Sequence, residues 1–177
     1  MKTSFQTVAL IGKYKSSELG EPLLHLASFF EQRNLEVLLA QQTAECIGPA
    51  PYATASMAEI GARADLAVVL GGDGTMLNVA RELIEFNVPL VGVNQGRLGF
   101  LTDVSIEHML ETMEEILAGE YIAEERFLLN TAVRRQGQII SQAYAFNDVA
   151  VSKGMSGRLI ELEVFIDGQF VYSQRSD

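Results

Sequence analysis

The chain has a single cysteine, Cys46, and therefore can form no internal disulfide. Such scarcity is typical of a reducing compartment, so we expect a cytoplasmic location. Residues 1–6 lack the apolar core of a signal peptide. No apolar run approaches the roughly 20 residues that a bilayer-spanning helix needs, so no membrane protein is predicted.

Basic residues are also scarce: 13 Lys and Arg stand against 23 Asp and Glu, and the net charge is −10. Nucleic acids and anionic membrane surfaces select basic patches, so we expect neither as a partner. This charge does not exclude a phosphorylated small molecule as a ligand, but it favours a cation that accompanies the ligand.

What the chain does contain is a large apolar fraction, 48% of its residues, arranged as strands alternating with helices. Strands are predicted at 7–11, 37–39, 66–70 and 89–93, and helices at 19–33, 57–62, 76–84 and 106–117. Residues 41–54 are predicted to be a polar loop. This alternation predicts an open, mostly parallel α/β sheet of Rossmann-like type with right-handed crossovers.

The pattern changes near residue 125. Segments 127–134 and 139–146 flank a hairpin signal, and Asp167-Gly168 is a two-residue turn between segments 160–166 and 169–174. We therefore expect a Rossmann-like domain over residues 1–125. Residues 126–177 are expected to begin an antiparallel, β-sandwich domain.

The chain is organised around the sequence GGDGT at residues 71–75, which follows the wholly apolar strand 66–70. Ligands of α/β sheets bind at the carboxyl ends of strands, where glycines let backbone amides approach a phosphate. The Asp73 carboxylate would repel bare phosphate, so its function would be to accept a hydroxyl proton or to lie near a phosphate-bound metal ion. The alternative is an ordinary Asp-Gly turn, which the flanking strand and helix disfavour.

A second glycine-rich turn follows the strand at 89–93, at what should be the same edge of the sheet. Within it Asn94 is a candidate for hydrogen bonds to a ligand amide or ribose, and Phe100 for stacking on a ring. Further on, Asn147 and Asp148 interrupt an apolar run, which indicates either a turn or a ligand contact.

Taken together, four motifs resemble those of the NAD kinase family: GGDGTML at 71–77, GVNQGRLGFLTD at 92–103, ND at 147–148 and SQRSD at 173–177. GGDGT alone is shared with diacylglycerol-kinase-like lipid kinases, whereas the second and fourth motifs are more specific. The resemblance implies transfer of the γ-phosphate of ATP to the 2′-hydroxyl of the adenosine ribose of NAD, which gives NADP.

The resemblance also implies roles for individual residues. Asp73 corresponds to the catalytic acid/base. The implied NAD contacts are Asp73, Gly74, Asn147, Asp148, Arg158, Arg175 and Asp177, and further nucleotide contacts are expected from Gly72, Thr75, Asn94 and Phe100. Asp148 stands where the family often has Glu, a mild departure. No residue is assigned as a metal ligand, although a divalent ion, Mg²⁺, is expected, as is a dimer or tetramer of identical chains.

The family's chain continues through further strands of a β-sandwich, so we expect these 177 residues to be a fragment with little or no activity alone. Two other functions stay open. A lipid kinase would use the same aspartate turn, and a non-catalytic module would bind nucleotide without transferring phosphate.

Overall fold

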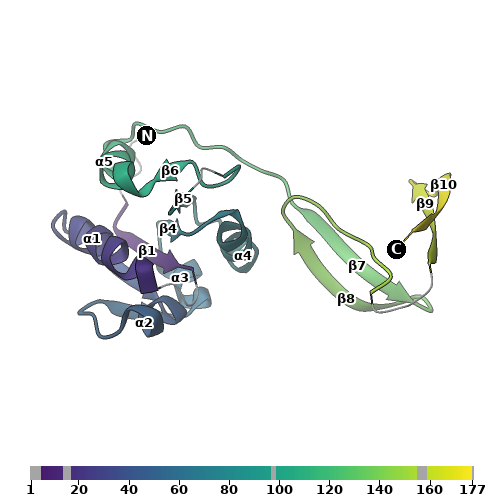
Figure 1. The fold of residues 1–177 in the computed structure, drawn as a ribbon, viewed down its shortest axis with the longest axis horizontal. Helices are drawn as coiled ribbons and strands as arrows, with labels where there is room; N and C mark the ends of the chain where they lie inside the picture. The colour runs from purple at the N-terminus through teal and green to yellow at the C-terminus, as the bar shows by residue number, and fades with distance from the viewer. Residues whose placement is uncertain (1–4, 14–16, 97–98, 155–158, 177) are drawn as a thin grey trace. The chain divides into compact units, whose positions relative to one another are not determined.

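The computed structural model describes residues 5–13, 17–96, 99–154 and 159–176. The chain divides into two compact units, Met1–Arg126 and Phe127–Asp177 (Figure 1).

The first unit is built on a six-stranded, wholly parallel sheet in the order β3-β2-β1-β4-β5-β6. The strands are β1 (Thr7–Gly12), β2 (Glu36–Ala40), β3 (Ala53–Ala55), β4 (Leu66–Leu70), β5 (Leu90–Asn94) and β6 (Val104–Ser105). The chain first adds strands on one side of β1 and then, from β4 onward, on the other. This is the strand order of Rossmann folds, so the predicted α/β sheet is confirmed.

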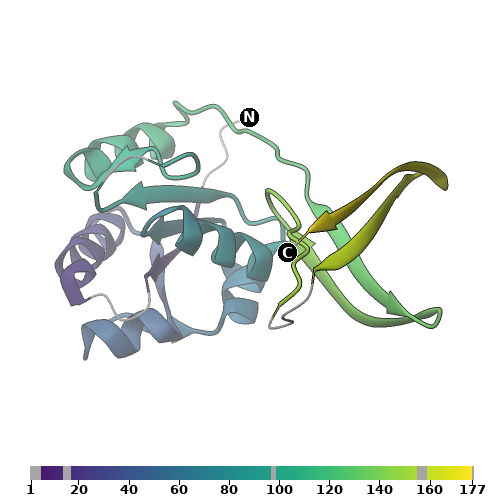
Figure 2. The ribbon, with the colours of Figure 1, turned by 45° about the vertical axis from the view of Figure 1, so that its right-hand side comes forward.

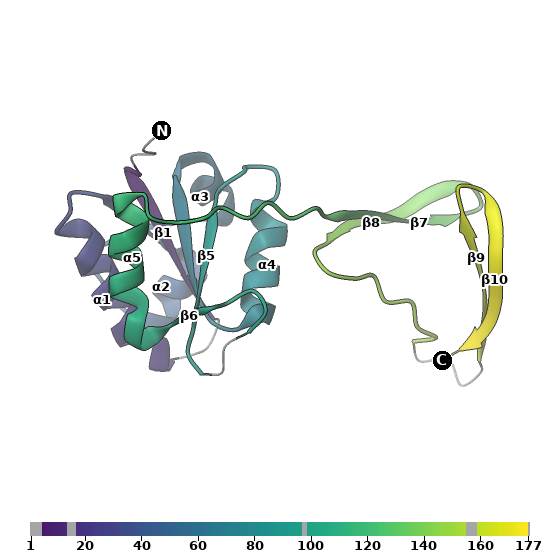
Figure 3. The same ribbon diagram turned by 90° about the horizontal axis from the view of Figure 1, so that it is seen from above.

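Helices cover both faces of this sheet. They are η1 (Ser17–Leu19), α1 (Gly20–Glu31), α2 (Gln41–Ile47), α3 (Met57–Arg63), α4 (Asp73–Leu83), η2 (Ile106–His108) and α5 (Met109–Ala118). Figure 3 shows α1 and α5 on one side of the strands, with α3 and α4 on the other. The unit thus has three layers, and the sheet lies in the middle.

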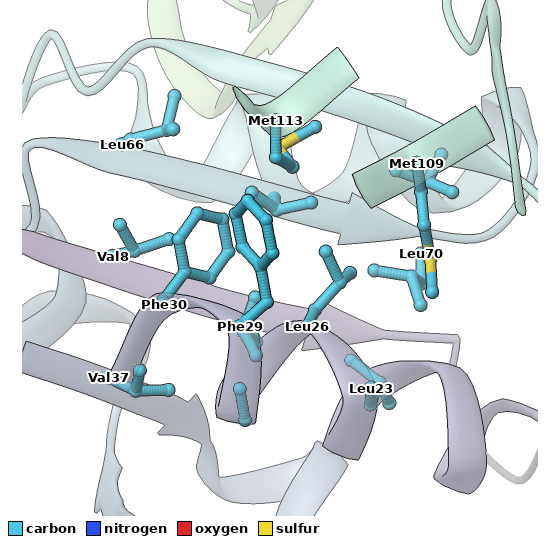
Figure 4. Close-up of a cluster of buried hydrophobic side chains, with 14 of the residues drawn as sticks. Val8, Leu23, Leu26, Phe29, Phe30, Val37, Leu66, Leu70, Met109 and Met113 are labelled. Atoms are coloured by element: carbon cyan, nitrogen blue, oxygen red, sulfur yellow. The ribbon is translucent and has the colours of Figure 1, made fainter. Parts of the chain in front are cut away.

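The larger core cluster lies between the sheet and α1, α2 and α5 (Figure 4). Phe29 and Phe30 of α1 meet edge to face, 5.3 Å between ring centroids, and Met113 of α5 is fully buried. A second cluster fills the opposite face. Alternate residues of β4 enter one cluster or the other, which is why this strand reads as an unbroken apolar run.

The prediction of a loop over residues 41–54 is wrong, because α2 and β3 lie within it. One face of α2 packs on the core through Ala44 and Ile47, and the Thr43 hydroxyl accepts a hydrogen bond from Gly12 N–H at 2.8 Å. These contacts stabilise a helix that its polar composition did not indicate. The prediction also began the helix after GGDGT too late, since α4 starts at Asp73.

The second unit consists of two antiparallel hairpins, β7 (Leu129–Arg135) with β8 (Gln138–Ala145) and β9 (Ile160–Ile166) with β10 (Gln169–Ser176). Figure 2 shows each as a twisted ribbon. Their two-residue turns, Gln136-Gly137 and Asp167-Gly168, have positive φ at both positions, from 50° to 79°, as type I′ turns require. Both predicted hairpins are confirmed. No described residue of this unit is buried.

Candidate functional site

The site begins at the carboxyl ends of β1 and β4, the neighbouring strands at which the order of strand addition reverses. Two backbone hydrogen bonds hold the ends of neighbouring strands together here: Lys13 N–H donates to Leu70 O, and Gly71 N–H donates to Val93 O, both at 2.9 Å. Ligands of doubly wound sheets bind outside such a reversal point.

A cavity of about 650 Å³ opens at this edge. It is lined by the ends of β1 and β2, by the first turns of α2 and α3, and by the first three turns of α4. Its residues include Gly12, Lys13, Thr43, Ser56, Gly72, Gly74, Thr75, Asn78 and Glu82. The volume is within the range of small-molecule pockets. Lys13 supplies a cation and the start of α4 supplies N–H groups, both of which favour a bound anion.

Asp73 is the first residue of α4, and the second glycine-rich turn folds onto its carboxylate. Phe100 N–H donates to Oδ2 at 2.9 Å, and Leu101 N–H donates to Oδ1 at 3.0 Å. The Thr102 hydroxyl also donates to Oδ1, at 3.1 Å. The two glycine-rich turns, at 71–75 and after β5, are therefore linked by hydrogen bonds to the Asp73 carboxylate.

These hydrogen bonds lower the pKa of Asp73 below its ordinary value. The Phe100 and Leu101 amides have the largest effects, partial desolvation opposes them, and Thr102 adds a smaller lowering. The Asp73 carboxyl is therefore ionised at neutral pH and can only accept hydrogen bonds.

Two glycines allow this approach. A Cβ at Gly99 would lie 2.1 Å from Asp73 Oδ1, and a Cβ at Gly92 would lie 2.8 Å from the Leu101 carbonyl oxygen and 3.0 Å from Thr102 Cα. A side chain at position 99 would displace the carboxylate, and one at position 92 would push away the backbone that binds it.

Gly72 and Gly74 are different, since a Cβ at either position would have no atom within 4 Å and neither has positive φ. Nothing in the described protein requires glycine there. Gly74 is exposed. The space beside Asp73 is therefore open to a ligand on the side of the helix terminus.

A buried polar pair supports the loop from behind. Asn94 and Thr102 are 8% and 0% exposed, and Asn94 Nδ2 donates to Thr102 Oγ1 at 3.0 Å. Asn94 Oδ1 accepts from Gly96 N–H at 3.0 Å. The Asn94 amide is thus engaged within the protein, and its predicted nucleotide contact stays a prediction.

The structure brings Gly72, Asp73, Gly74 and Thr75 together at the start of α4, with Phe100 beside them. The Phe100 side chain is 95% exposed. Asn147, Asp148 and Arg175 belong to the second unit. Arg175 lies 3.9 Å from Glu161 across the β9–β10 hairpin. Arg158 and Asp177 lie outside the described residues.

Sequence reasoning assigned no role to Gly99 or Thr102, although both stand in the second motif. The sequence does hold a signal for them: Gly99 and the Thr102 hydroxyl follow the strand at 89–93, at the sheet edge where the Asp73 carboxylate is also expected. Thr43 gives no such signal, because the polar composition of residues 41–54 predicts a loop there.

The part of the chain that the structure describes contains no cluster of three or more His, Cys, Asp or Glu side chains placed to hold a metal ion. Of the described helices, none has the length and apolar character needed to cross a bilayer.

Comparisons with known proteins agree with this geometry. Residues 8–121 match the family model described as the ATP-NAD kinase N-terminal domain. The chain is 52% identical over 175 residues to the NAD kinase of Nitrosomonas eutropha, covering 99% of this chain and 59% of that protein. It is 55% identical over 178 residues to the NAD kinase of Aromatoleum aromaticum, covering 100% and 59%.

A crystal structure of yeast NADH kinase complexed with NADH has the same fold, with a TM-score of 0.87 at 24% identity over 99% of this chain and 57% of that one. The chain thus spans about 60% of the length of the curated relatives it matches. Because the family model covers well over half of its residues, the chain belongs to the NAD kinase family.

Proposed function

We propose that this protein takes part in the phosphorylation of NAD by ATP to give NADP. The observation that carries the proposal is the ionised Asp73 carboxylate, which the loop amides of Phe100 and Leu101 hold in place at the carboxyl end of β4. Beside it stand Gly72 and Gly74, where no contact within the described protein requires glycine. The family supports the identity of both substrates. The chain spans only part of its relatives, so the activity of the whole protein is a proposal here.

In the proposed reaction, Asp73 accepts a hydrogen bond from the 2′-hydroxyl of the adenosine ribose and orients its oxygen toward the γ-phosphorus of ATP. The new O–P bond forms, the bond to the β-phosphate oxygen breaks, and ADP leaves. The hydroxyl proton passes to Asp73. Phosphoryl transfer depends chiefly on positioning and charge neutralisation, so a carboxylate of low basicity is adequate for this role.

The cavity is the proposed place for the phosphate donor. Lys13 lines the same space as Gly72, Gly74 and Thr75 at the start of α4, and both a lysine and a helix N-terminus suit phosphate oxygens. Since the described residues build no cation cage, Mg²⁺ is proposed to enter bound to ATP, as part of the substrate.

Other parts of the proposal rest on the family resemblance alone. Asn147, Asp148, Arg158, Arg175 and Asp177 are proposed to contact NAD, and Gly72, Thr75, Asn94 and Phe100 to contact nucleotide. We also propose a homo-oligomer and a cytoplasmic location.

The test is NADP formation from NAD and Mg-ATP, measured for this chain and for a chain extended to the length of its relatives. Asp73→Asn should lower turnover by about 10²- to 10⁴-fold, as the loss of a positioned proton acceptor does. Asp167→Asn is the matched control. Asp167 has a positive φ in a hairpin turn, and asparagine readily adopts the same backbone conformation.

Each other outcome favours a different function. Phosphorylation of a lipid hydroxyl in place of NAD would support a lipid kinase. Binding of NAD or ATP without transfer in either chain, with Asp73→Asn binding normally, would support a non-catalytic module.

A further inference from the structure

Resting on the proposed function, we propose that Gly99 and Thr102 are positioning residues for Asp73. Gly99 admits the carboxylate to the loop, and Thr102 fixes oxygen Oδ1, so that Oδ2 is the oxygen presented to the substrate hydroxyl.

The two oxygens of Asp73 are occupied unequally. Among the described residues Oδ1 accepts hydrogen bonds from Leu101 N–H and the Thr102 hydroxyl, whereas Oδ2 accepts one, from Phe100 N–H. A carboxylate oxygen has about two lone-pair sites. Oδ1 is therefore filled by the protein, and Oδ2 keeps capacity for one more donor.

The direction of the Thr102 hydroxyl follows from its neighbours. Gly96 N–H can only donate, so the Asn94 atom that it meets is the amide oxygen. The Asn94 amide nitrogen then faces Thr102 and donates to Oγ1. With Oγ1 acting as acceptor on that side, the Thr102 proton points to Asp73 Oδ1 at 3.1 Å. A chain of three donors therefore runs from a backbone amide to the carboxylate.

Gly99 completes the arrangement by its lack of a side chain. A Cβ there would lie 2.1 Å from Oδ1 and 2.6 Å from Cγ of Asp73. The backbone of Gly99 does not have the positive φ that would demand glycine for another reason. The Asp73 carboxylate is thus the group with which a side chain at position 99 collides.

The groups that lower the pKa of Asp73 are hydrogen-bond donors of residues 100–102, and no charged side chain is among them in the described part of the chain. Removal of a donor should therefore raise the pKa of Asp73 without interference from a neighbouring charge. The ionisation of Asp73 reports directly on its attachment to the loop.

The test is an NMR titration of the Asp73 carboxyl carbon in this chain, which needs no activity. Thr102→Val removes the hydroxyl at nearly constant shape and should raise the pKa of Asp73, and Thr102→Ser should restore it. Gly99→Ala should raise it by displacing the carboxylate. Gly20→Ala is the control glycine, since its added Cβ would make only ordinary contact with Ile47, at 3.6 Å, and Gly20 takes no part in the hydrogen bonds to Asp73. It should leave the titration unchanged.

The second readout is the pH dependence of turnover, in whichever length of the protein makes NADP. Thr102→Val and Gly99→Ala should lower kcat by about 10- to 100-fold, the size expected for a misplaced catalytic group, and should move the acidic limb of the profile to higher pH. The KM for ATP should not change, and Thr102→Ser should recover both kcat and the limb.

The proposal is overturned if Asp73 titrates alike in wild type, Thr102→Val and Gly99→Ala, or if Thr102→Val lowers kcat without moving the acidic limb. A wild type that makes no NADP at any length, yet shows the expected titrations, would refute the proposed function and leave the attachment of Asp73 supported.

Discussion

At the scale of single residues, the glycines of the site differ in what they would collide with. Gly92→Ala would place a Cβ against the backbone of Leu101 and Thr102, which cannot move independently of the loop. We expect the free energy of unfolding to fall by about 1–3 kcal/mol, as overpacking does. Urea denaturation of the first unit measures this.

Gly74→Ala is the matched comparison, because its Cβ meets no protein atom and it lies in helix α4. Alanine there should leave the unfolding free energy unchanged or raise it by up to about 1 kcal/mol. In an active form of the protein it should raise the KM for NAD. Equal destabilisation by both alanines would show that contacts with the loop backbone are not what distinguishes Gly92.

The residue scale also shows what the sequence could predict of the site. Asp73 stood out because a carboxylate between glycines contradicts a simple phosphate cradle. Thr102 did not, since its importance depends on hydrogen bonds to Asp73 and from Asn94, 29 and 8 residues away. These hydrogen bonds form because the segment between β5 and β6 folds onto the start of α4, and no local sequence pattern encodes that contact.

At the scale of elements, α3 has a capping box that sets its start at the cavity. Glu59 N–H donates to Ser56 Oγ at 3.3 Å, and Ser56 N–H donates to the Glu59 carboxylate at 2.8 Å. Ser56→Ala should lower the free energy of unfolding by about 1 kcal/mol. Ser28→Ala is the control, because Ser28 lies within α1 and its hydroxyl accepts a hydrogen bond from the exposed Gln32 side chain instead of capping a helix.

The same box predicts a pH dependence. Hydrogen bonds from Ser56, the backbone amide first, lower the pKa of Glu59 below its ordinary value. The ionised form therefore stabilises the fold: its contribution is complete above the ordinary glutamate range and is lost as pH falls through the lowered pKa. Glu59→Gln should be less stable than wild type at pH 7, and the difference should shrink below about pH 4. A difference that is constant with pH would contradict this.

Elements were predictable where periodicity and turn chemistry agreed. The buried strand β4, the helix α1 and both type I′ hairpins follow from apolar spacing and from glycines that supply positive φ. Helix α2 was not predictable, because only two of its apolar residues reach the core and its polar residues line the cavity. Strand β3, three residues long, exists through its pairing with β2.

At the scale of the whole molecule, burial is unevenly divided. Every buried hydrophobic residue of the described chain lies between Val8 and Ile116, within the first unit. The hairpins of the second unit expose large side chains, among them Phe165 and Phe170, which contact each other edge to face at 5.7 Å. An isolated two-stranded ribbon is marginally stable in water.

The two units should therefore differ in amide hydrogen exchange. In this chain we expect amides of β7–β10 to exchange nearly as fast as unstructured peptide, because opening a ribbon without buried side chains costs little free energy. Amides of β1 and β4 should exchange only with unfolding of the first unit. A chain extended to the length of its relatives should protect β7–β10 if its added residues cover Phe165 and Phe170. Protection of β7–β10 equal to that of β1 in the 177-residue chain would show instead that the hairpins already have a stable partner, such as a second copy, and dilution of the sample would then restore fast exchange.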